Sequence, residues 1–315
     1  MTQPPNTSLP ERLRTNIARA VVGKPEVIDL TLATLLAGGH LLVEDVPGLG
    51  KTLLAKAVAR SLGGRFSRVQ FTPDLLPSDI TGTTVLDPAG GGFGFRPGPV
   101  FANILLGDEL NRATPRTQSA LLEAMEERQV TVDGTSHALP DPFFVIATQN
   151  PVEQQGVYDL PEAQLDRFLM KITVGYPSRA DEVAIVTGQL TARPIDSIEA
   201  VATEAELAEA MAAVRALHVD ETLVEYAVRI VEATRGHSDL ILGASPRASL
   251  ALVTASRAMA WLRGARYVTP DDMKRLAAPV LRHRLMLKPQ ATLGGRTADA
   301  LVAELLETVE LPLLR

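Results

Sequence analysis

Apolar residues in the first half of the chain fall into short runs rich in β-branched side chains, and segments with helical periodicity separate these runs. Five runs predict strands, at residues 40–45, 67–71, 103–109, 143–149 and 168–174. Such runs in alternation with amphipathic helices are typical of a parallel sheet covered by helices. We therefore expect an α/β fold with a five-stranded parallel sheet.

The pattern changes after residue 180, where Ala, Leu, Glu and Arg recur at helical spacing and strand signals stop. One helix start is clear, since Thr269 fits an N-cap and Pro270 the first turn. The first ten residues carry three prolines and little apolar content. We therefore expect a disordered tail at 1–10, an α/β core at 11–180 and a smaller all-α lid domain at 181–315.

Two intervals rich in glycine and proline interrupt the predicted core, at residues 72–99 and near 133–142. The first contains DPAGGGFGFRPGP, a composition that favours turns over buried structure. We interpret it as a hairpin or a mobile loop.

Composition narrows the function. The 315 residues include no cysteine, which excludes disulfides, thiol catalysis and cysteine-based zinc sites. A net charge of −6 disfavours a broad attraction to nucleic acid. The densest basic stretch, residues 282–288, is interpreted as a solvated helix face, and the five histidines lack metal-ligand spacing. Neither a signal peptide nor a long apolar run is present, so a cytoplasmic protein without a membrane span is expected.

A phosphate-binding loop follows the first predicted strand. Gly48, Gly50, Lys51 and Thr52 stand between that strand and an amphipathic helix, the order that a P-loop requires. Backbone amides of the loop and the helix N-terminus would surround phosphate oxygens. Lys51 would neutralise the β and γ phosphates of ATP, and Thr52 would ligate Mg²⁺. The strict pattern has glycine where this chain has Asp45, which leaves the loop geometry open.

An acid pair ends the third predicted strand. Asp108 and Glu109 would lie at the carboxyl edge of the sheet, where open parallel sheets bind their ligands. Asp108 would hold Mg²⁺, and Glu109 would polarise the water that attacks the γ phosphate. An acid pair after an apolar run is on its own commonly just a strand end, and the P-loop upstream favours the catalytic interpretation.

Three further polar positions follow in order. Asn150 comes after the fourth strand in ATQNP, Arg167 precedes the fifth strand in DLPEAQLDRF, and Arg247 opens a helix in GASPRAS, with Ser245 as N-cap. They resemble sensor 1, the arginine finger and sensor 2 of AAA+ ATPases. Arg167 could instead form a structural ion pair with Asp166 or Asp159.

Longer stretches make the resemblance specific. They are DLLPSDITGT (74–83), FRPGPVFANILLGDELNRATPRTQSALLEAMEERQVTVDG (95–134), FFVIATQNPVEQQGVYDLPEAQLDRFLMKI (143–172) and ASPRAS (244–249). In these stretches the chain resembles the MoxR family of AAA+ ATPases. The resemblance implies a hairpin inserted in a helix near residues 84–99, and a second hairpin at residues 128–139.

The resemblance also implies function. It implies an ATP hydrolase with chaperone-like activity on partner proteins, often with von Willebrand factor A domains, and a ring, commonly a hexamer, in which Arg167 acts on a neighbour's ATP. The residues assigned to nucleotide binding are Gly23, Val46, Pro47, Gly48, Leu49, Gly50, Lys51, Thr52, Leu53 and Arg247. Those assigned to catalysis are Lys51, Glu109, Asn150, Arg167 and Arg247. Arg112 and Arg116 are open between a neighbouring nucleotide and a surface role.

Two alternative functions use the same residues. A metal-chelatase ATPase subunit shares the hairpins and also works with a partner that has an A domain. A DNA-dependent motor is a further alternative, which the acidic net charge disfavours.

Overall fold

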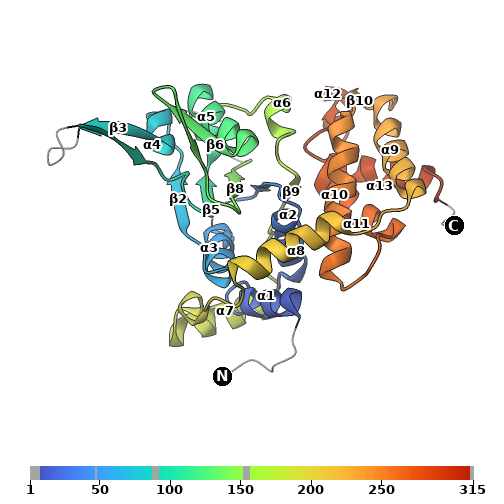
Figure 1. Cartoon of the computed structure of the whole chain (residues 1–315). Helices are drawn as coiled ribbons and strands as arrows, with labels where there is room; N and C mark the ends of the chain where they lie inside the picture. Colours follow the sequence, from blue (N-terminus) through green and yellow to red (C-terminus); the bar gives the residue numbers. More distant parts are fainter. Residues whose placement is uncertain (1–7, 47, 87–91, 152–156, 313–315) are drawn as a thin grey trace. The chain divides into compact units, whose positions relative to one another are not determined.

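The computed structural model describes residues 8–46, 48–86, 92–151 and 157–312, with helices and strands labelled in Figure 1. The chain forms two compact units, each discontinuous in sequence. The first comprises residues 1–28, 40–160 and 173–207, and the second comprises residues 29–39, 161–172 and 208–315. The domain boundary expected at residue 180 stays a prediction.

A five-stranded sheet is confirmed. Its order is β2 (Phe66–Gln70), β5 (Ile104–Asp108), β8 (Phe144–Gln149), β1 (Leu41–Glu44) and β9 (Met170–Ile172). The neighbouring pairs β2–β5, β5–β8 and β8–β1 are parallel. Side chains of β1, β5 and β8 are buried along most of each strand. Strands buried on both faces carry apolar residues at consecutive positions, and this is why continuous apolar runs in the sequence predict them.

The first unit contains four strands of this sheet, β1, β2, β5 and β8, whereas β9 belongs to the second unit. The first unit also contains helices. They are α1 (Leu9–Ala18), α3 (Lys51–Ser61), α4 (Pro77–Thr81), η1 (Leu110–Arg112), α5 (Pro115–Glu127), α7 (Arg179–Thr191) and η2 (Pro194–Ser197). Two more, α2 (Pro25–Leu36) and α8 (Glu204–Ala216), have residues in both units. Of the tail expected at residues 1–10, Leu9 and Pro10 belong to α1, and residues 1–7 lie outside the described residues.

The ring of His40, the residue before β1, contacts the backbone of β8 and of α5. Its Nδ1 accepts a hydrogen bond from the Val145 amide at 3.0 Å, and its Nε2 lies 3.2 Å from the Met125 carbonyl. Only the neutral ring with a proton on Nε2 satisfies both partners. Complete burial lowers the pKa of His40 to about 3, and the charge of Arg128 adds to this effect.

Both expected hairpins are present. The first pairs β3 (Gly82–Leu86) with β4 (Phe93–Pro97), and the second pairs β6 (Gln129–Val132) with β7 (Thr135–Ala138). The β3–β4 hairpin extends away from the sheet (Figure 1). It follows the short helix α4, and residues 98–103, which lead to β5, are not helical. The expectation of a hairpin inserted in a helix is therefore wrong on its C-terminal side.

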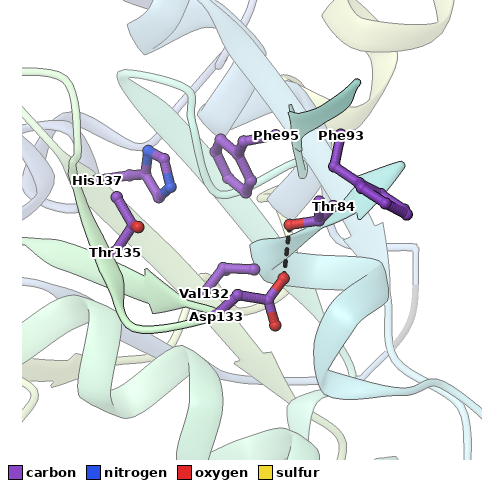
Figure 2. A pocket seen from close by; sticks show the side chains of 7 residues that line it. All are labelled: Thr84, Phe93, Phe95, Val132, Asp133, Thr135 and His137. Atoms are coloured by element: carbon purple, nitrogen blue, oxygen red, sulfur yellow. Dashed lines mark hydrogen bonds between the residues drawn. The ribbon is translucent and has the colours of Figure 1, made fainter. Parts of the chain in front are cut away.

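Side chains fasten the two hairpins to each other (Figure 2). The rings of Phe95 and His137 stack, with centroids 3.8 Å apart and planes at 16°. Beside them the Thr84 hydroxyl donates to an Asp133 carboxylate oxygen at 2.6 Å. These residues line an open cavity of about 580 Å³, together with Phe93, whose side chain is exposed.

The second unit is mainly helical. It contains α6 (Glu162–Leu165), α9 (Glu221–Arg235), α10 (Pro246–Leu262), α11 (Pro270–Leu281), α12 (Pro289–Leu293) and α13 (Ala298–Thr308). A short antiparallel ribbon of β10 (Leu240–Leu242) and β11 (Met286–Leu287) accompanies them, which the all-α expectation did not include. Thr269 caps α11 as predicted, since its hydroxyl oxygen accepts from the Asp272 amide at 3.4 Å.

The basic stretch at residues 282–288 is not the solvated helix face that we expected. Helix α11 ends at Leu281, and the next residues turn into β11. His283 and Arg284 are 5% and 9% exposed. Arg284 can be buried because carboxylate and carbonyl oxygens accept its donors, as described below.

Within the described ranges, no helix combines the length and the apolar character that crossing a bilayer requires.

Candidate functional site

The glycine-rich loop has the conformation that its sequence predicts. Gly48 and Gly50 adopt left-handed φ angles of 88° and 86°, which favour glycine. A Cβ atom built on either glycine would meet no atom within 4 Å, so the loop leaves open space beside its backbone. Helix α3 begins at Lys51, directly after this loop. The arrangement provides an anion site at a helix N-terminus.

Lys51 lies beside three carboxylates. Its side chain is largely buried, and its Nζ donates to the Asp45 carbonyl oxygen at 2.7 Å. The pKa of Lys51 is lowered, because burial outweighs the opposing effect of the negative charges of Asp108, Asp45 and Glu109. The sheet agrees with this, because β1 and β5, which precede the P-loop and the acid pair, lie on either side of β8 and end at one edge.

Asp45 explains the departure from the strict P-loop pattern. One carboxylate oxygen accepts hydrogen bonds from the backbone amides of Val174 and Gly175, at 2.8 and 2.7 Å. The other accepts from the Val46 amide at 2.9 Å. The side chain thus fixes the start of the loop to the segment that begins at residue 173. A glycine could not make these contacts.

Asp108 ends β5 and is 9% exposed. It accepts hydrogen bonds from the Thr148 hydroxyl at 2.7 Å and from the Arg68 guanidinium at 2.6 Å. The next residue, Glu109, has a left-handed backbone with φ 57° and ψ 51°, and its amide donates to Thr148 Oγ at 2.8 Å. A non-glycine residue in this region costs about 1–3 kcal/mol and is often found at functional sites.

Two side chains donate hydrogen bonds to one oxygen, Oε2, of the Glu109 carboxylate. Gln70 Nε2 donates to it at 2.7 Å, and Arg112 Nη1 donates at 2.9 Å. Arg112, whose role was open, therefore contacts the acid pair of its own chain. Arg116 lies on the exposed side of α5, and its role stays open.

Asn150 follows β8 directly and is 5% exposed. Because β8 lies between β5 and β1, three neighbouring parallel strands end at the acid pair, at Asn150 and at the P-loop. Sequence order alone separates these residues by up to a hundred positions, and the sheet brings their strand ends to one edge.

A cavity of about 510 Å³ lies beside the loop in the first unit. Its lining is mainly apolar and includes Leu49, Leu53, Val22, Val174, Tyr176 and Ile185. A cavity of this size and character suits a small aromatic ligand.

Of the predicted nucleotide-binding residues, Gly48, Leu49, Gly50 and Leu53 line this cavity, and Gly23, Val46 and Thr52 do not. Gly23 stands between two lining residues with φ 72°, and a Cβ there would lie 2.2 Å from the Asp181 carboxyl carbon. Thr52 is half-buried in the first turn of α3, and Val46 precedes the loop. Pro47 lies outside the described residues.

Arg167 and Arg247 belong to the second unit. Both line a cavity of about 240 Å³ together with Arg284 and Asp166. Asp166 forms an ion pair with Arg284 at 2.6 Å. The structure therefore brings the two predicted arginines together in one unit, and the lysine, the acid pair and Asn150 together in the other.

Sequence reasoning missed three residues that hold the acid pair. Thr148 stands inside the quoted ATQNP motif, two residues before Asn150, which was a usable signal. Arg68 and Gln70 alternate on β2, and Gln70 is in register with Asp108. The pairing of β2 with β5 depends on the order of strands in the sheet, and the apolar runs in the sequence do not predict this order.

The sheet, the P-loop and the acid pair define an ATPase of the AAA class. The family model described as "ATPase family associated with various cellular activities (AAA)" matches residues 40–170, and the model described as "AAA lid domain" matches residues 232–305. A solved structure titled as a putative ATPase from Cytophaga hutchinsonii superimposes with a TM-score of 0.91 at 37% identity, over 96% of this chain and 94% of that one.

Relatives specify the family. Chaperone MoxR1 of Mycobacterium tuberculosis is 43% identical, over 96% of this chain and 82% of its own length. Protein MoxR of Methylorubrum extorquens is 32% identical, over 96% and 94%, and the protein YeaC of Bacillus subtilis is 50% identical, over 95% and 94%. The chain belongs to the MoxR family of AAA+ ATPases, which are ATP-hydrolysing enzymes.

Proposed function

We propose that this chain hydrolyses ATP at the P-loop of its first unit and uses the free energy to remodel, activate or assemble partner proteins. The observation that carries the proposal is the edge of the sheet at which the open glycine loop with Lys51 and the acid pair Asp108 and Glu109 end neighbouring parallel strands. Membership of a family that includes a protein named as a chaperone supports the remodelling role.

The binding of ATP follows from the shape of the site. The triphosphate lies along the loop, where backbone amides and Lys51 neutralise its oxygens. The adenine base enters the apolar cavity beside Leu49 and Tyr176. Gly23 lies between the lining residues Val22 and Lys24, and its lack of a side chain permits the close approach of Asp181.

The donor set at the phosphate end fits Mg²⁺. The Thr52 hydroxyl and the Asp108 carboxylate offer the hard oxygen ligands that Mg²⁺ prefers, and they would hold it directly or through water. When bound, Mg²⁺ supplies positive charge to the β and γ phosphates. Arg68 donates to one oxygen of Asp108 and Thr148 to the other, and these bonds would orient the carboxylate that holds the ion.

Glu109 is the proposed general base. Gln70 and Arg112 both donate to Oε2 of its carboxylate, and these bonds would hold the group in place while it accepts a proton from the attacking water. Asn150, at the neighbouring strand end, orients that water or the γ phosphate. The left-handed backbone and the Thr148 contact fix where Glu109 leaves the strand.

The proposal extends to assembly. We propose a ring, most simply a hexamer, in which Arg167 reaches the ATP of the adjacent subunit and stabilises charge on the transferring phosphoryl group. Arg247 responds to the γ phosphate, and its contacts relax after hydrolysis, which moves the helical unit between two states. The proposed client is a protein that contains a von Willebrand factor A domain. The family resemblance supports these points.

Two substitutions test the nucleotide site. Lys51→Ala should abolish binding of a fluorescent ATP analogue, whereas Lys56→Ala, an exposed lysine on the same helix, should leave it unchanged. Glu109→Gln should bind the analogue normally and release phosphate at least about 100-fold more slowly. Glu123→Gln, an exposed acid on α5, serves as its control. Normal phosphate release by Glu109→Gln would refute the assignment of the base.

Assembly and client are tested separately. Native mass spectrometry with and without ATP measures the ring size. Affinity capture on Glu109→Gln loaded with ATP should retain a partner that contains an A domain, and capture on Lys51→Ala should not. A partner retained equally by both variants would contradict ATP-dependent client binding.

A further inference from the structure

The second unit contains a cavity with an excess of positive charge. Arg167, Arg247 and Arg284 line it, and Asp166 is the single acid in the lining. The other lining residues are neutral, and most of them are small or apolar, for example Leu169 and Leu250. Three guanidinium groups against one carboxylate favour an anionic ligand in the cavity.

Arg284 has a structural role in this cavity. Its side chain is 4% exposed. Its Nε donates to the Asp166 carboxylate at 2.6 Å, and Nη2 donates to the carbonyls of Phe168 and Asp166 at 2.7 and 3.2 Å. Nη1 donates to the carbonyls of Leu169, at 3.2 Å, and of Val280. A guanidinium has five N–H donors, and all five are used, so none remains for a ligand.

These bonds fix the backbone on both sides of Arg167. The accepting groups belong to residues 166, 168 and 169, so the segment that carries Arg167 is anchored to the end of α11. The position of the Arg167 side chain therefore depends on the buried ion pair between Asp166 and Arg284.

The second carboxylate oxygen of Asp166 reaches the other arginine's helix. It accepts a hydrogen bond from the Ser245 hydroxyl at 3.1 Å. Ser245 is the N-cap residue of α10, but its side chain makes no hydrogen bond to the helix backbone, unlike Thr269 at α11. Arg247 follows two residues later. One carboxylate therefore connects the segment of Arg167 to the start of the helix of Arg247.

The electrostatics agree with this arrangement. Burial lowers the pKa of Arg284, the ion pair with Asp166 raises it, and the positive charge of Arg247 lowers it further. Arg247 therefore lies close enough to the buried pair to affect it. The Asp166 carboxylate allows these like charges to stand near one another.

We infer that Asp166 and Arg284 are positioning residues, which hold Arg167 and Arg247 as one two-armed clamp for the phosphate groups of a nucleotide bound to a second copy of this chain. The inference rests on the proposed function, since that function supplies the nucleotide and the neighbouring subunit. It adds that Arg247, like Arg167, acts on the neighbour's nucleotide and not on that of its own chain, and that the Asp166–Arg284 pair sets the separation of the two arginines.

The test compares Asp166→Asn with a matched control. Asp272 is also a buried carboxylate of the second unit, held at 2.8 Å by Arg263 and bonded to a helix-capping hydroxyl, but it does not line the cavity. Asp166→Asn should lower kcat by about 10- to 100-fold with unchanged affinity for an ATP analogue, because a small misplacement of a catalytic group has effects of this size. Asp272→Asn should lower thermal stability at least as much and leave kcat within twofold of the wild-type value.

Mixtures of two variants provide a second measurement, the recovery of turnover, which a defect in folding alone would not produce. Lys51→Ala subunits bind no nucleotide but carry an intact clamp, so adding them to Asp166→Asn subunits should restore turnover at hybrid interfaces. Ser245→Ala, a mild change at an exposed residue, should lower kcat severalfold with little effect on stability. This variant keeps the test informative if Asp166→Asn folds poorly.

The outcomes separate the two proposals. If Arg167→Ala is inactive while Asp166→Asn and Ser245→Ala turn over like the wild type, the positioning role is wrong and the proposed function stands. Equal losses of kcat in Asp166→Asn and Asp272→Asn would also overturn the positioning role. If Arg167→Ala turns over like the wild type, the shared site is wrong and the clamp is wrong with it.

Discussion

Replacement of Asp45 by glycine is expected to destabilise the first unit, even though glycine is the residue that the strict P-loop pattern has at this position. The Asp45 carboxylate accepts three backbone N–H bonds, two of them from Val174 and Gly175. Glycine removes all three acceptor contacts and leaves the peptide chain free to move at the start of the loop.

The magnitude follows from the number of bonds and their exposure. A hydrogen bond to a charged group contributes about 1.5–3 kcal/mol. Asp45 is half-buried, so water can replace part of what is lost at its partners. Glycine adds a backbone entropy cost of roughly 0.5–1 kcal/mol. We expect Asp45→Gly to lower the free energy of unfolding by about 2–4 kcal/mol.

The assay is urea denaturation followed by circular dichroism, with hydrogen exchange of the Val174 and Gly175 amides as a local measure. Both amides should exchange faster in Asp45→Gly. Asp45→Asn keeps one acceptor oxygen, so it should fall between the wild type and Asp45→Gly. An Asp45→Gly protein as stable as the wild type, with unchanged exchange at these amides, would refute the reasoning.

Three further predictions concern other parts of the first unit. Thr148→Val keeps the shape but removes a hydroxyl that bonds Asp108, so kcat should fall about tenfold in phosphate-release assays while ATP affinity stays constant. Gly23→Ala brings a Cβ against Asp181 at a left-handed φ, so it should cost about 1–3 kcal/mol in urea denaturation and weaken ATP binding, and a normal value for both would contradict the packing argument. The folded-state pKa of His40 is about 3, against an ordinary value of 6.5. Its contribution to the free energy of unfolding is therefore complete above pH 6.5 and falls by about 1 kcal/mol per pH unit as the pH drops toward 3. The free energy of unfolding of His40→Gln should depend less steeply on pH, and equal slopes would show that another group is responsible.

The sequence pattern contained most of the sheet. All five strands lie within two residues of the runs that predicted them, because buried parallel strands need apolar residues at nearly every position. The P-loop and the acid pair were also readable, since each stands at a fixed offset from its strand. Their proximity was expected from the rule that parallel strands end at a common edge.

The contacts that hold the site depend on distant residues. Gln70 reaches Glu109 only because β2 and β5 are neighbours, and Arg284 finds Asp166 across 118 positions of sequence. The basic stretch at residues 282–288 looked solvated for the same reason, since nothing in its local pattern shows the carboxylate that neutralises it. The short ribbon of β10 and β11 has too few residues to produce a period-2 signal.

The paired hairpins have a mechanical consequence. Since the Phe95–His137 stack and the bond from Thr84 join their stems, a force applied to one hairpin is shared by both. The stem of the β6–β7 hairpin continues back through α5 to Glu109, so the covalent chain connects the hairpins to the proposed general base. A displacement of one hairpin would therefore displace the other, and α5 connects both to the segment that carries the acid pair.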